Sequence, residues 1–174
     1  MKSLRFLVCA PVFALVASVA LAFEVQAAMS VPLNGEWRLD YFPQPDDGAL
    51  RELPIKVPME TVQATVPGNC ELDLVNAGVL PPPELGMNVL KLRPYEGYQW
   101  LYTKVFPKPC MKPGQRAMLT FEGIDTLADI FLNGTKIGET SNMLIPHSFN
   151  VTGKLISGAI TAVYELLINL IILG

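Results

Sequence analysis

The residues with the most reactive side chains are few and far apart in this sequence. There is one histidine, His147, and there are three cysteines, Cys9, Cys70 and Cys110. A Ser–His–Asp triad needs a nucleophile beside its histidine, and no partner is evident near His147, so we expect a loop histidine. Because the sequence has no CxxC motif and a single histidine, zinc or redox chemistry is not expected. We predict no metal and no cofactor.

Two of the cysteines fall in the central part of the chain. Cys70 and Cys110 could form a disulfide in an oxidising compartment, but nothing in their spacing requires it. Whether they pair is left open by the sequence. The simpler interpretation, which we favour, is a pair of buried thiols.

The charged residues are nearly balanced, with 13 basic and 16 acidic side chains and a net charge of −3. This balance argues against a nucleic-acid partner, because such proteins neutralise many phosphates with Lys and Arg. A hydrophobic content of 51% also excludes a disordered chain. Carboxylate pairs could serve as acid and base, but each acidic residue is better explained as a solvated charge. We therefore assign no catalytic residue.

The N-terminus has the pattern of an export signal. Lys2 and Arg5 precede an uncharged apolar run over residues 6–23, and small residues follow at 20–22 and 25–27. A positive start, an apolar centre and a small-x-small end are typical of a secretory signal peptide. We predict a signal-peptide helix over residues 1–27 and an exported protein, periplasmic or extracellular. The alternative is an uncleaved membrane anchor.

The chain between residues 33 and 152 contains short strands separated by turns rather than long helices. Apolar and charged residues alternate over residues 36–41, which predicts a half-buried strand. Residues 63–66 end a strand at a Pro-Gly turn, and residues 71–76 form one short helix closed by Gly78.

The clearest strands come later in the chain. Residues 100–106, 116–122 and 128–132 are apolar or alternating, with a Pro-Gly turn between the first two. Asn133-Gly134 then predicts a tight hairpin, because both residues tolerate the positive φ angles of a type I′ turn. With residues 135–138 as the returning strand, the pattern indicates an all-β fold, a β-sandwich or jelly roll.

Several short motifs occur in an order that resembles a known family. They are residues 33–37 (LNGEW), 66–69 (VPGN), 100–102 (WLY), 119–126 (LTFEGIDT), 130–134 (IFLNG) and 149–152 (FNVT). Together they resemble the N-terminal sugar-binding domain of glycoside hydrolase family 2, nearest to its β-mannosidase-like branch. The resemblance implies a galactose-binding-domain-like jelly roll, which we place at residues 28–154.

The resemblance also implies where catalysis would lie. Retaining glycosidases use two carboxyl groups about 5–5.5 Å apart, and in this family both glutamates belong to a barrel further along the chain, typically of about 250 residues. The family's acid/base glutamate follows an asparagine, and no Asn-Glu dipeptide occurs in this sequence. We therefore expect a non-catalytic domain whose partner is the missing catalytic barrel, so that this chain alone is inactive.

A carbohydrate ligand is the other partner that the resemblance implies. Sugars are bound by aromatic rings that stack on C–H faces and by polar groups that bond hydroxyls. The segment after the Pro-rich loop offers both kinds of side chain, in Asn88, Tyr95, Glu96, Tyr98 and Trp100. The alternative is that Trp100 packs in the core and the two tyrosines only support the loop. Trp37 is expected in the core.

The family pattern fades near residue 155. Residues 155–174 form an apolar tail with one charge, Glu165, among its last residues. This tail could be a degenerate last strand, a membrane-seeking helix, or the product of a truncated gene, and we favour truncation. A sheet without its closing strand would leave an unpaired edge, so we expect poor solubility. A membrane contact is expected only through the signal peptide or this tail.

These observations leave three hypotheses for function. The first is a non-catalytic sugar-binding domain or fragment of an exported family 2 glycoside hydrolase. The second is an autonomous carbohydrate-binding module. The third is a membrane-tethered structural β-sandwich. The sequence does not specify the sugar or the linkage.

Overall fold

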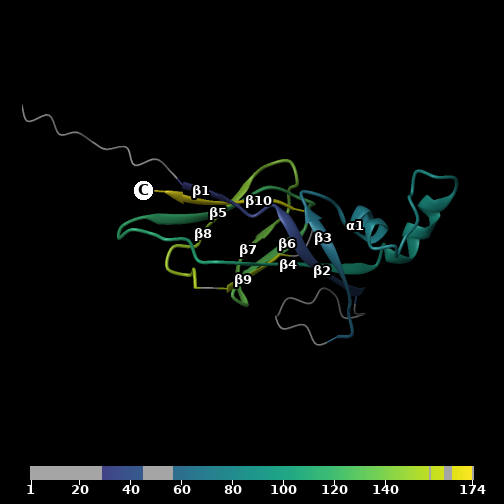
Figure 1. Cartoon of the computed structure of the whole chain (residues 1–174), viewed down its shortest axis with the longest axis horizontal. Helices are drawn as coiled ribbons and strands as arrows, with labels where there is room; N and C mark the ends of the chain where they lie inside the picture. Colours follow the sequence, from purple (N-terminus) through teal and green to yellow (C-terminus); the bar gives the residue numbers. More distant parts are fainter. Residues whose placement is uncertain (1–28, 45–56, 157, 163–165, 174) are drawn as a thin grey trace, which may run out of the picture.

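The computed structural model describes residues 29–44, 57–156, 158–162 and 166–173. The predicted signal peptide lies outside these residues. Two antiparallel β-sheets form the two layers of a sandwich, and the helices gather at one end (Figure 1). The predicted all-β sandwich is therefore confirmed.

The first sheet has four strands and the second has six. The four-stranded sheet runs, in spatial order, β1 (Met29–Pro32), β10 (Leu166–Leu173), β5 (Arg116–Ile124) and β8 (His147–Asn150). The six-stranded sheet runs β3 (Glu60–Val66), β2 (Gly35–Pro43), β4 (Tyr98–Phe106), β9 (Gly158–Ala162), β6 (Ala128–Leu132) and β7 (Thr135–Thr140). Every pair of neighbouring strands is antiparallel.

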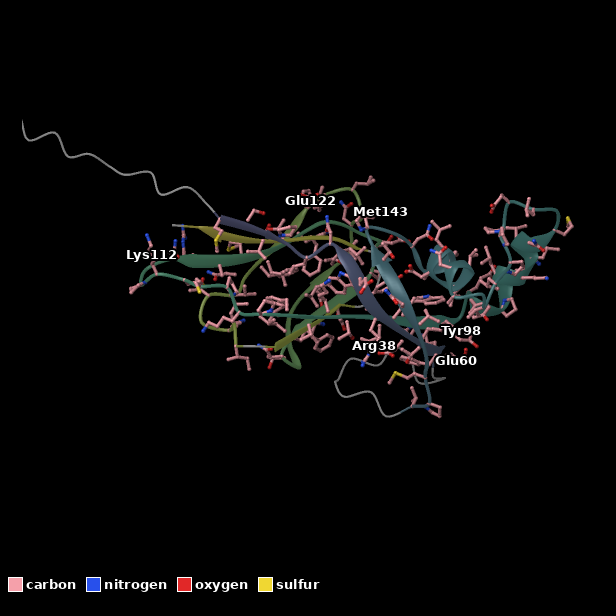
Figure 2. The ribbon with its side chains drawn as sticks, viewed as in Figure 1. Arg38, Glu60, Tyr98, Lys112, Glu122 and Met143 are labelled. Atoms are coloured by element: carbon pink, nitrogen blue, oxygen red, sulfur yellow. The ribbon has the colours of Figure 1, made fainter. Side chains whose placement is uncertain are left out.

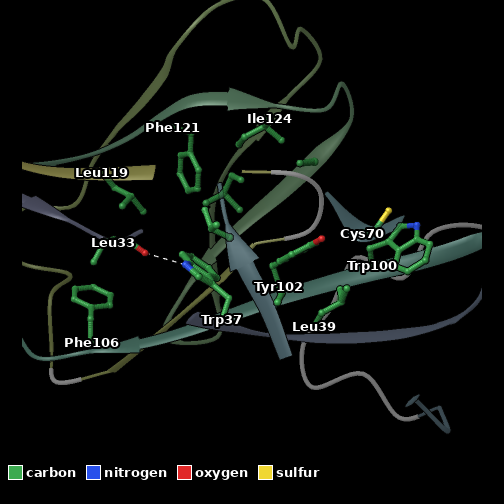
Figure 3. Packing of buried hydrophobic residues seen from close by; sticks show 14 of the residues in the cluster. Leu33, Trp37, Leu39, Cys70, Trp100, Tyr102, Phe106, Leu119, Phe121 and Ile124 are labelled. Carbon is green, nitrogen blue, oxygen red and sulfur yellow. Dashed lines mark hydrogen bonds between the residues drawn. The ribbon is translucent and has the colours of Figure 1, made fainter. Parts of the chain in front are cut away.

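Alternating side chains from both sheets meet in one hydrophobic core (Figure 3). Trp37 and Leu39 of β2 and Tyr102 of β4 face Leu119 and Phe121 of β5. Because successive side chains of a strand point to opposite faces, the same strands expose polar residues on the other side. The indole Nε1 of Trp37 donates to the carbonyl of Leu33 at 2.8 Å, so the polar atom of this core residue is satisfied.

The predicted hairpin between β6 and β7 is present. Asn133 and Gly134 have φ angles of 53° and 78°, the left-handed conformations that this turn requires. The Asn133 side-chain amide also donates to the carbonyl of Lys154 at 2.9 Å. The turn is thus tied to the segment that leads into β9.

The apolar tail forms two strands that complete the sheets. Strand β9 lies between β4 and β6, and β10 lies between β1 and β5. For the described residues 158–162 and 166–173 the structure shows the strand interpretation of the tail, and the expected unpaired edge left by a lost closing strand is wrong. Within the described part of the chain, no helix is both long and apolar enough to cross a membrane.

One short α-helix is fixed to the sandwich by a buried carboxylate. Helix α1 (Cys70–Asn76) is capped by Asn69, whose side chain accepts the backbone N–H of Leu72 at 2.8 Å. Asp73 accepts the backbone N–H of Thr65 at 2.9 Å and the Tyr102 hydroxyl at 3.2 Å. Burial raises the pKa of Asp73, while these two hydrogen bonds oppose the rise.

Two expectations about reactive residues need correction. Cys70 is buried as expected, but Cys110 is exposed, and the two are not joined by a disulfide. His147 begins strand β8 instead of lying in a loop, and its Nε2 is 2.7 Å from the carbonyl oxygen of Asn142. The edge strand that contains it has only four residues, which is too short for its alternation to be recognised in the sequence.

Candidate functional site

An arm of residues 81–97 projects beyond α1 at one end of the sandwich (Figure 1, teal). It contains the 3₁₀ helix η1 (Asn88–Tyr95), which the sequence did not predict. The Asn88 side-chain amide donates to the carbonyl of Pro82 at 3.0 Å and closes the Pro-rich loop. Where the arm rejoins the sheet, just before β4, the carbonyl of Gly97 accepts the backbone N–H of Gln44 at 2.7 Å.

Four aromatic rings meet where the arm joins the sheet. Tyr41 of β2 stacks on Trp100 of β4 with 5.6 Å between ring centroids, and Tyr95 of the arm lies 5.0 Å from Tyr98. The remaining pairs are 6.1–6.4 Å apart. All of these separations lie in the range where aromatic pairs attract each other. The rings therefore form one cluster, which fixes the base of the arm.

A carboxylate at the edge of this cluster bonds one of its hydroxyls. The Tyr41 hydroxyl donates to Glu60 at 2.7 Å, and Glu60 lies at the same end of the molecule as Tyr98 (Figure 2). Burial, the bond to Glu60 and its negative charge together raise the pKa of Tyr41. Burial also raises the pKa of Tyr95, with Tyr98 and Glu60 contributing. Both phenols are therefore neutral hydrogen-bonding groups at physiological pH.

A cavity of about 560 Å³ lies between the arm, α1 and the β5–β6 turn. Its volume falls within the usual range of about 300–1,000 Å³ for small-molecule sites. Apolar, aromatic and charged side chains share its wall. The lining residues are Cys70, Glu71, Val89, Leu90, Leu92, Arg93, Tyr95, Glu96, Tyr98, Trp100 and Asp125.

The structure brings four of the predicted site residues together at this cavity. Tyr95, Glu96, Tyr98 and Trp100 all line it. Trp100 is only 7% exposed, so it belongs to the core and presents part of its ring to the cavity. Asn88 does not line the cavity, because its side chain is used within the arm. The structure thus gives Asn88 a structural position and leaves the other four at the site.

Other lining residues come from parts of the chain that sequence reasoning did not connect. Cys70 and Glu71 begin helix α1, and Asp125 follows strand β5. They reach the cavity only through the folding of the two sheets. Arg93, by contrast, stands two residues before Tyr95 in the segment already singled out. The positive charge of Arg93 was the feature of the sequence that could have identified it as a site residue.

The charged groups of the cavity are mostly acidic. Three carboxylates, Glu71, Glu96 and Asp125, face a single cation, Arg93. The salt bridges found among the described residues involve none of these four side chains. No group of three or more His, Cys, Asp or Glu in the described part of the chain is placed to hold a metal ion. The charged side chains that line the cavity therefore sum to a negative charge, and no salt bridge among the described residues neutralises any of the three carboxylates.

A second hollow lies on β2, β3 and β4, with a volume of about 580 Å³. Polar residues such as Arg38, Gln63 and Thr103 line it. Its aromatic residue, Trp37, is 3% exposed and bonds the main chain through its indole nitrogen. This hollow therefore lacks the aromatic surface on which a sugar ring could stack.

The fold and the cavity place the chain in the class of antiparallel β-sandwich domains with a pocket at one end of the layers. Residues 46–170 match the family described as "Glycosyl hydrolase 2 galactose-binding domain-like", and the chain belongs to this family. The match extends through β9 and most of β10. It therefore continues past residue 155, where the motifs in the sequence had faded.

Relatives of known name share about a third of their residues with this chain. Beta-mannosidase B of Thermothelomyces thermophilus is 36% identical over 125 residues, and the match covers 72% of this chain and 13% of the relative. Mouse beta-mannosidase is 34% identical over 129 residues, covering 74% of this chain and 13% of the relative. The chain therefore spans about 13% of the length of these relatives.

Solved structures show the same fold. The beta-D-mannosidase of Dictyoglomus thermophilum has a TM-score of 0.59 and 32% identity, and the match covers 83% of this chain and 16% of that protein. The beta-glucuronidase of Bifidobacterium dentium, solved with coumarin-3-O-glucuronide, has a TM-score of 0.54 and 25% identity. That match covers 79% of this chain and 20% of the glucuronidase.

Proposed function

We propose that this chain is a carbohydrate-contacting, non-catalytic domain of an exported family 2 glycoside hydrolase. In this role the sandwich supplies one wall of the sugar site, and the hydrolytic carboxylates belong to polypeptide outside this chain. The ligand would be a β-linked glycoside. Family membership and the names of the relatives support the enzyme class.

The cavity with its aromatic wall is the observation that carries this proposal. Trp100 and Tyr98 come from the same face of β4, and Tyr95 stands over them from the arm with its ring 6.4 Å from that of Trp100. Rings stack on sugar C–H faces, while carboxylates and phenols accept or donate bonds to hydroxyls. The site therefore combines the two kinds of contact that a sugar needs.

Hydrolysis tests the non-catalytic part of the proposal. The purified chain is incubated with aryl β-mannosides, β-galactosides and β-glucuronides, and release of the aryl group is followed by absorbance. We expect no turnover above the rate in buffer. Turnover that survives purification to homogeneity would overturn the proposal.

Titration calorimetry with mono- and oligosaccharides tests the sugar contact. A domain that supplies only one wall should bind weakly, because the rest of the enzyme would provide the other contacts. Tight, saturable binding would instead favour the autonomous carbohydrate-binding module. The absence of binding at any sugar concentration would contradict the sugar contact itself.

The exported location rests on the N-terminal sequence. Lys2, Arg5 and the apolar run that follows support secretion with cleavage near residue 27. Expression of the full-length gene in its own host, followed by N-terminal sequencing of the protein, tests this. We expect a mature N-terminus near residue 28, in the periplasmic or extracellular fraction. An intact N-terminus in the cytoplasm would contradict it.

A further inference from the structure

The charge of the cavity bears on which sugars it accepts. Glu71 comes from α1, Glu96 from the arm and Asp125 from the β5–β6 turn, so the three carboxylates surround the cavity from separate elements. Arg93 is the one cation in the lining. A site that carries more negative than positive groups repels an anionic ligand and attracts a cationic one.

Local hydrogen bonds leave the acidic character of this lining unchanged. The Cys70 thiol lies 3.4 Å from a Glu71 oxygen, and the Thr126 hydroxyl donates to Asp125 at 2.8 Å. Both donors are neutral, so neither removes the charge of its carboxylate. The phenols of Tyr95 and Tyr98 can bond to sugar hydroxyls but contribute no positive charge.

The relatives differ in the charge of the sugars that their names and titles mention. Two of them are named for mannosides, which are neutral, whereas the Bifidobacterium dentium protein was solved with a glucuronide, whose sugar bears a carboxylate. The shared fold does not separate these two classes of ligand, so the charge of this chain's own lining is the available criterion. We propose that this cavity selects neutral or cationic hexosides and rejects uronic acids. This inference rests on the sugar contact proposed above.

The chain provides its own optical reporter for the test. It has two tryptophans, of which Trp100 lines the cavity and Trp37 lies elsewhere in the core. The purified protein is titrated with methyl β-D-glucoside, methyl β-D-glucuronide and methyl 6-amino-6-deoxy-β-D-glucoside, and Trp fluorescence is recorded. These ligands differ only at C6, which is neutral, anionic or cationic. Methyl β-D-mannoside serves as a second neutral ligand.

We expect the amino sugar to bind best and the glucuronide to bind at least about fivefold more weakly than the neutral glucoside. That ratio corresponds to the roughly 1 kcal/mol at the upper end for exposed charge pairs. The ratio should shrink as salt is raised, because salt screens partly exposed charges. This salt dependence is measured on the unmodified chain and does not depend on the folding of any variant.

Charge-removing variants locate the effect. In the double variant Glu71→Gln/Glu96→Gln, the glucuronide should approach the neutral glucoside in affinity. Glu84→Gln is the matched control, because Glu84 is exposed on the same arm and does not line the cavity. It should leave the order of the ligands as in the unmodified chain.

The outcomes separate the two proposals. Equal binding of the sugars at every salt concentration, or preferential binding of the glucuronide, would overturn the charge selection and leave the sugar contact intact. If none of the four sugars binds by fluorescence or calorimetry, the sugar contact fails, and the selection fails with it.

Discussion

Asp73 is a buried polar side chain that connects three separate elements of this domain. It belongs to α1, bonds the main chain of Thr65 at the end of β3, and accepts a hydroxyl from Tyr102 in β4. Its burial leaves little room for water to replace these partners. The position of α1, and therefore of Cys70 and Glu71 at the cavity, depends on this carboxylate.

Two substitutions of Asp73 should distinguish the contribution of its hydrogen bonds to stability from the contribution of its charge. Asp73→Ala leaves the Thr65 amide without this acceptor, which should lower the free energy of unfolding by about 1–3 kcal/mol. Asp73→Asn keeps an acceptor and should cost less. Urea unfolding at neutral pH measures both variants. Asp125→Asn, at an exposed position, is the control with the same chemical change.

The Asp73→Asn variant also has a predicted pH dependence. Because burial raises the pKa of Asp73 above its ordinary value of 3.8 in the unfolded chain, the folded state favours the protonated form. The stability that this group contributes is complete below pH 3.8 and is lost as pH rises through the raised pKa. As pH rises from about 4 to 7, the free energy of unfolding of the variant should therefore increase relative to that of the unmodified protein. A constant difference over this range would contradict the raised pKa.

Tyr41 should affect stability at high pH. Its raised pKa means that the folded protein holds the phenolic proton beyond pH 10, where an unfolded tyrosine ionises. Stability from this group is therefore complete below pH 10 and is lost at higher pH. In Tyr41→Phe, the free energy of unfolding should fall less steeply between pH 9 and 11, as measured by urea unfolding. Equal slopes for the two proteins would exclude this role.

Among the strands, β2 could be predicted from its alternation, whereas for β10 the sequence left a strand and a helix open. Strand β2 alternates apolar and charged residues, and its prediction was confirmed because only one of its faces is in the core. Strand β10 has the sequence LLINLIIL, in which Asn169 is the one polar residue. A continuous apolar run does not distinguish a central strand from a helix. Its partners β1 and β5 lie far away in the sequence, and only the fold reveals them.

The site was predictable only where its residues are close in sequence. Tyr95, Glu96, Tyr98 and Trp100 lie within six residues, and they do line one cavity. Glu71 and Asp125 come from separate elements, one before the arm and one after β5. Their approach depends on how α1 docks and how the two sheets align. No local pattern contains that information.

Gly138 occupies a close contact between the edges of the two sheets. A Cβ at this position would collide with the ring of Phe149 in β8, which itself packs edge-on against Phe121 at 6.0 Å. Gly138→Ala should therefore lower the free energy of unfolding by about 1–3 kcal/mol, the usual cost of overpacking. Thermal and urea unfolding measure this.

Gly97→Ala is the matched control for Gly138→Ala. A Cβ at Gly97 meets no atom within 4 Å, and its φ lies outside the left-handed region. This variant should unfold like the unmodified chain. If the Gly138 variant were as stable as this control, the Phe149 ring would be free to move aside, and the contact would not constrain the sheets.

The tail can be tested directly as a strand. Proline cannot donate to a β-ladder, so within sheets it is confined to edge strands, strand starts and bulges. Residue 170 of β10 is paired with both Val31 and Leu119. Leu170→Pro should therefore abolish cooperative unfolding, as followed by circular dichroism. An unchanged transition would show that the tail does not belong to the sheet.

Several large apolar side chains among the described residues are exposed to solvent. On the arm, Leu85 and Met87 are 59% and 72% exposed, and Leu144 in the β7–β8 connection is 85% exposed. Large exposed apolar patches mark surfaces that other polypeptide covers. The sequence predicted poor solubility from a missing strand, but β10 occupies that place in the sheet. The exposed arm now gives a different reason to expect association.

Association of the isolated chain tests this surface. In sedimentation velocity, the average mass should rise with protein concentration, and Leu85→Gln/Met87→Gln should reduce that rise. Val105→Gln is the control, because Val105 is 73% exposed on β4, away from the arm. A chain that stays monomeric at all concentrations would show that the arm is not an adhesive surface.

The pairing of β1 with β10 has a consequence for biosynthesis. Residues 29–32 emerge early from the ribosome, yet their ladder partner, residues 166–173, is translated more than a hundred residues later. Contacts between such distant segments form slowly, because a long loop must close first. The nascent polypeptide therefore cannot complete its four-stranded sheet until residues 166–173 have been synthesised. A chain kept open in this way would remain threadable, which would suit the export proposed above.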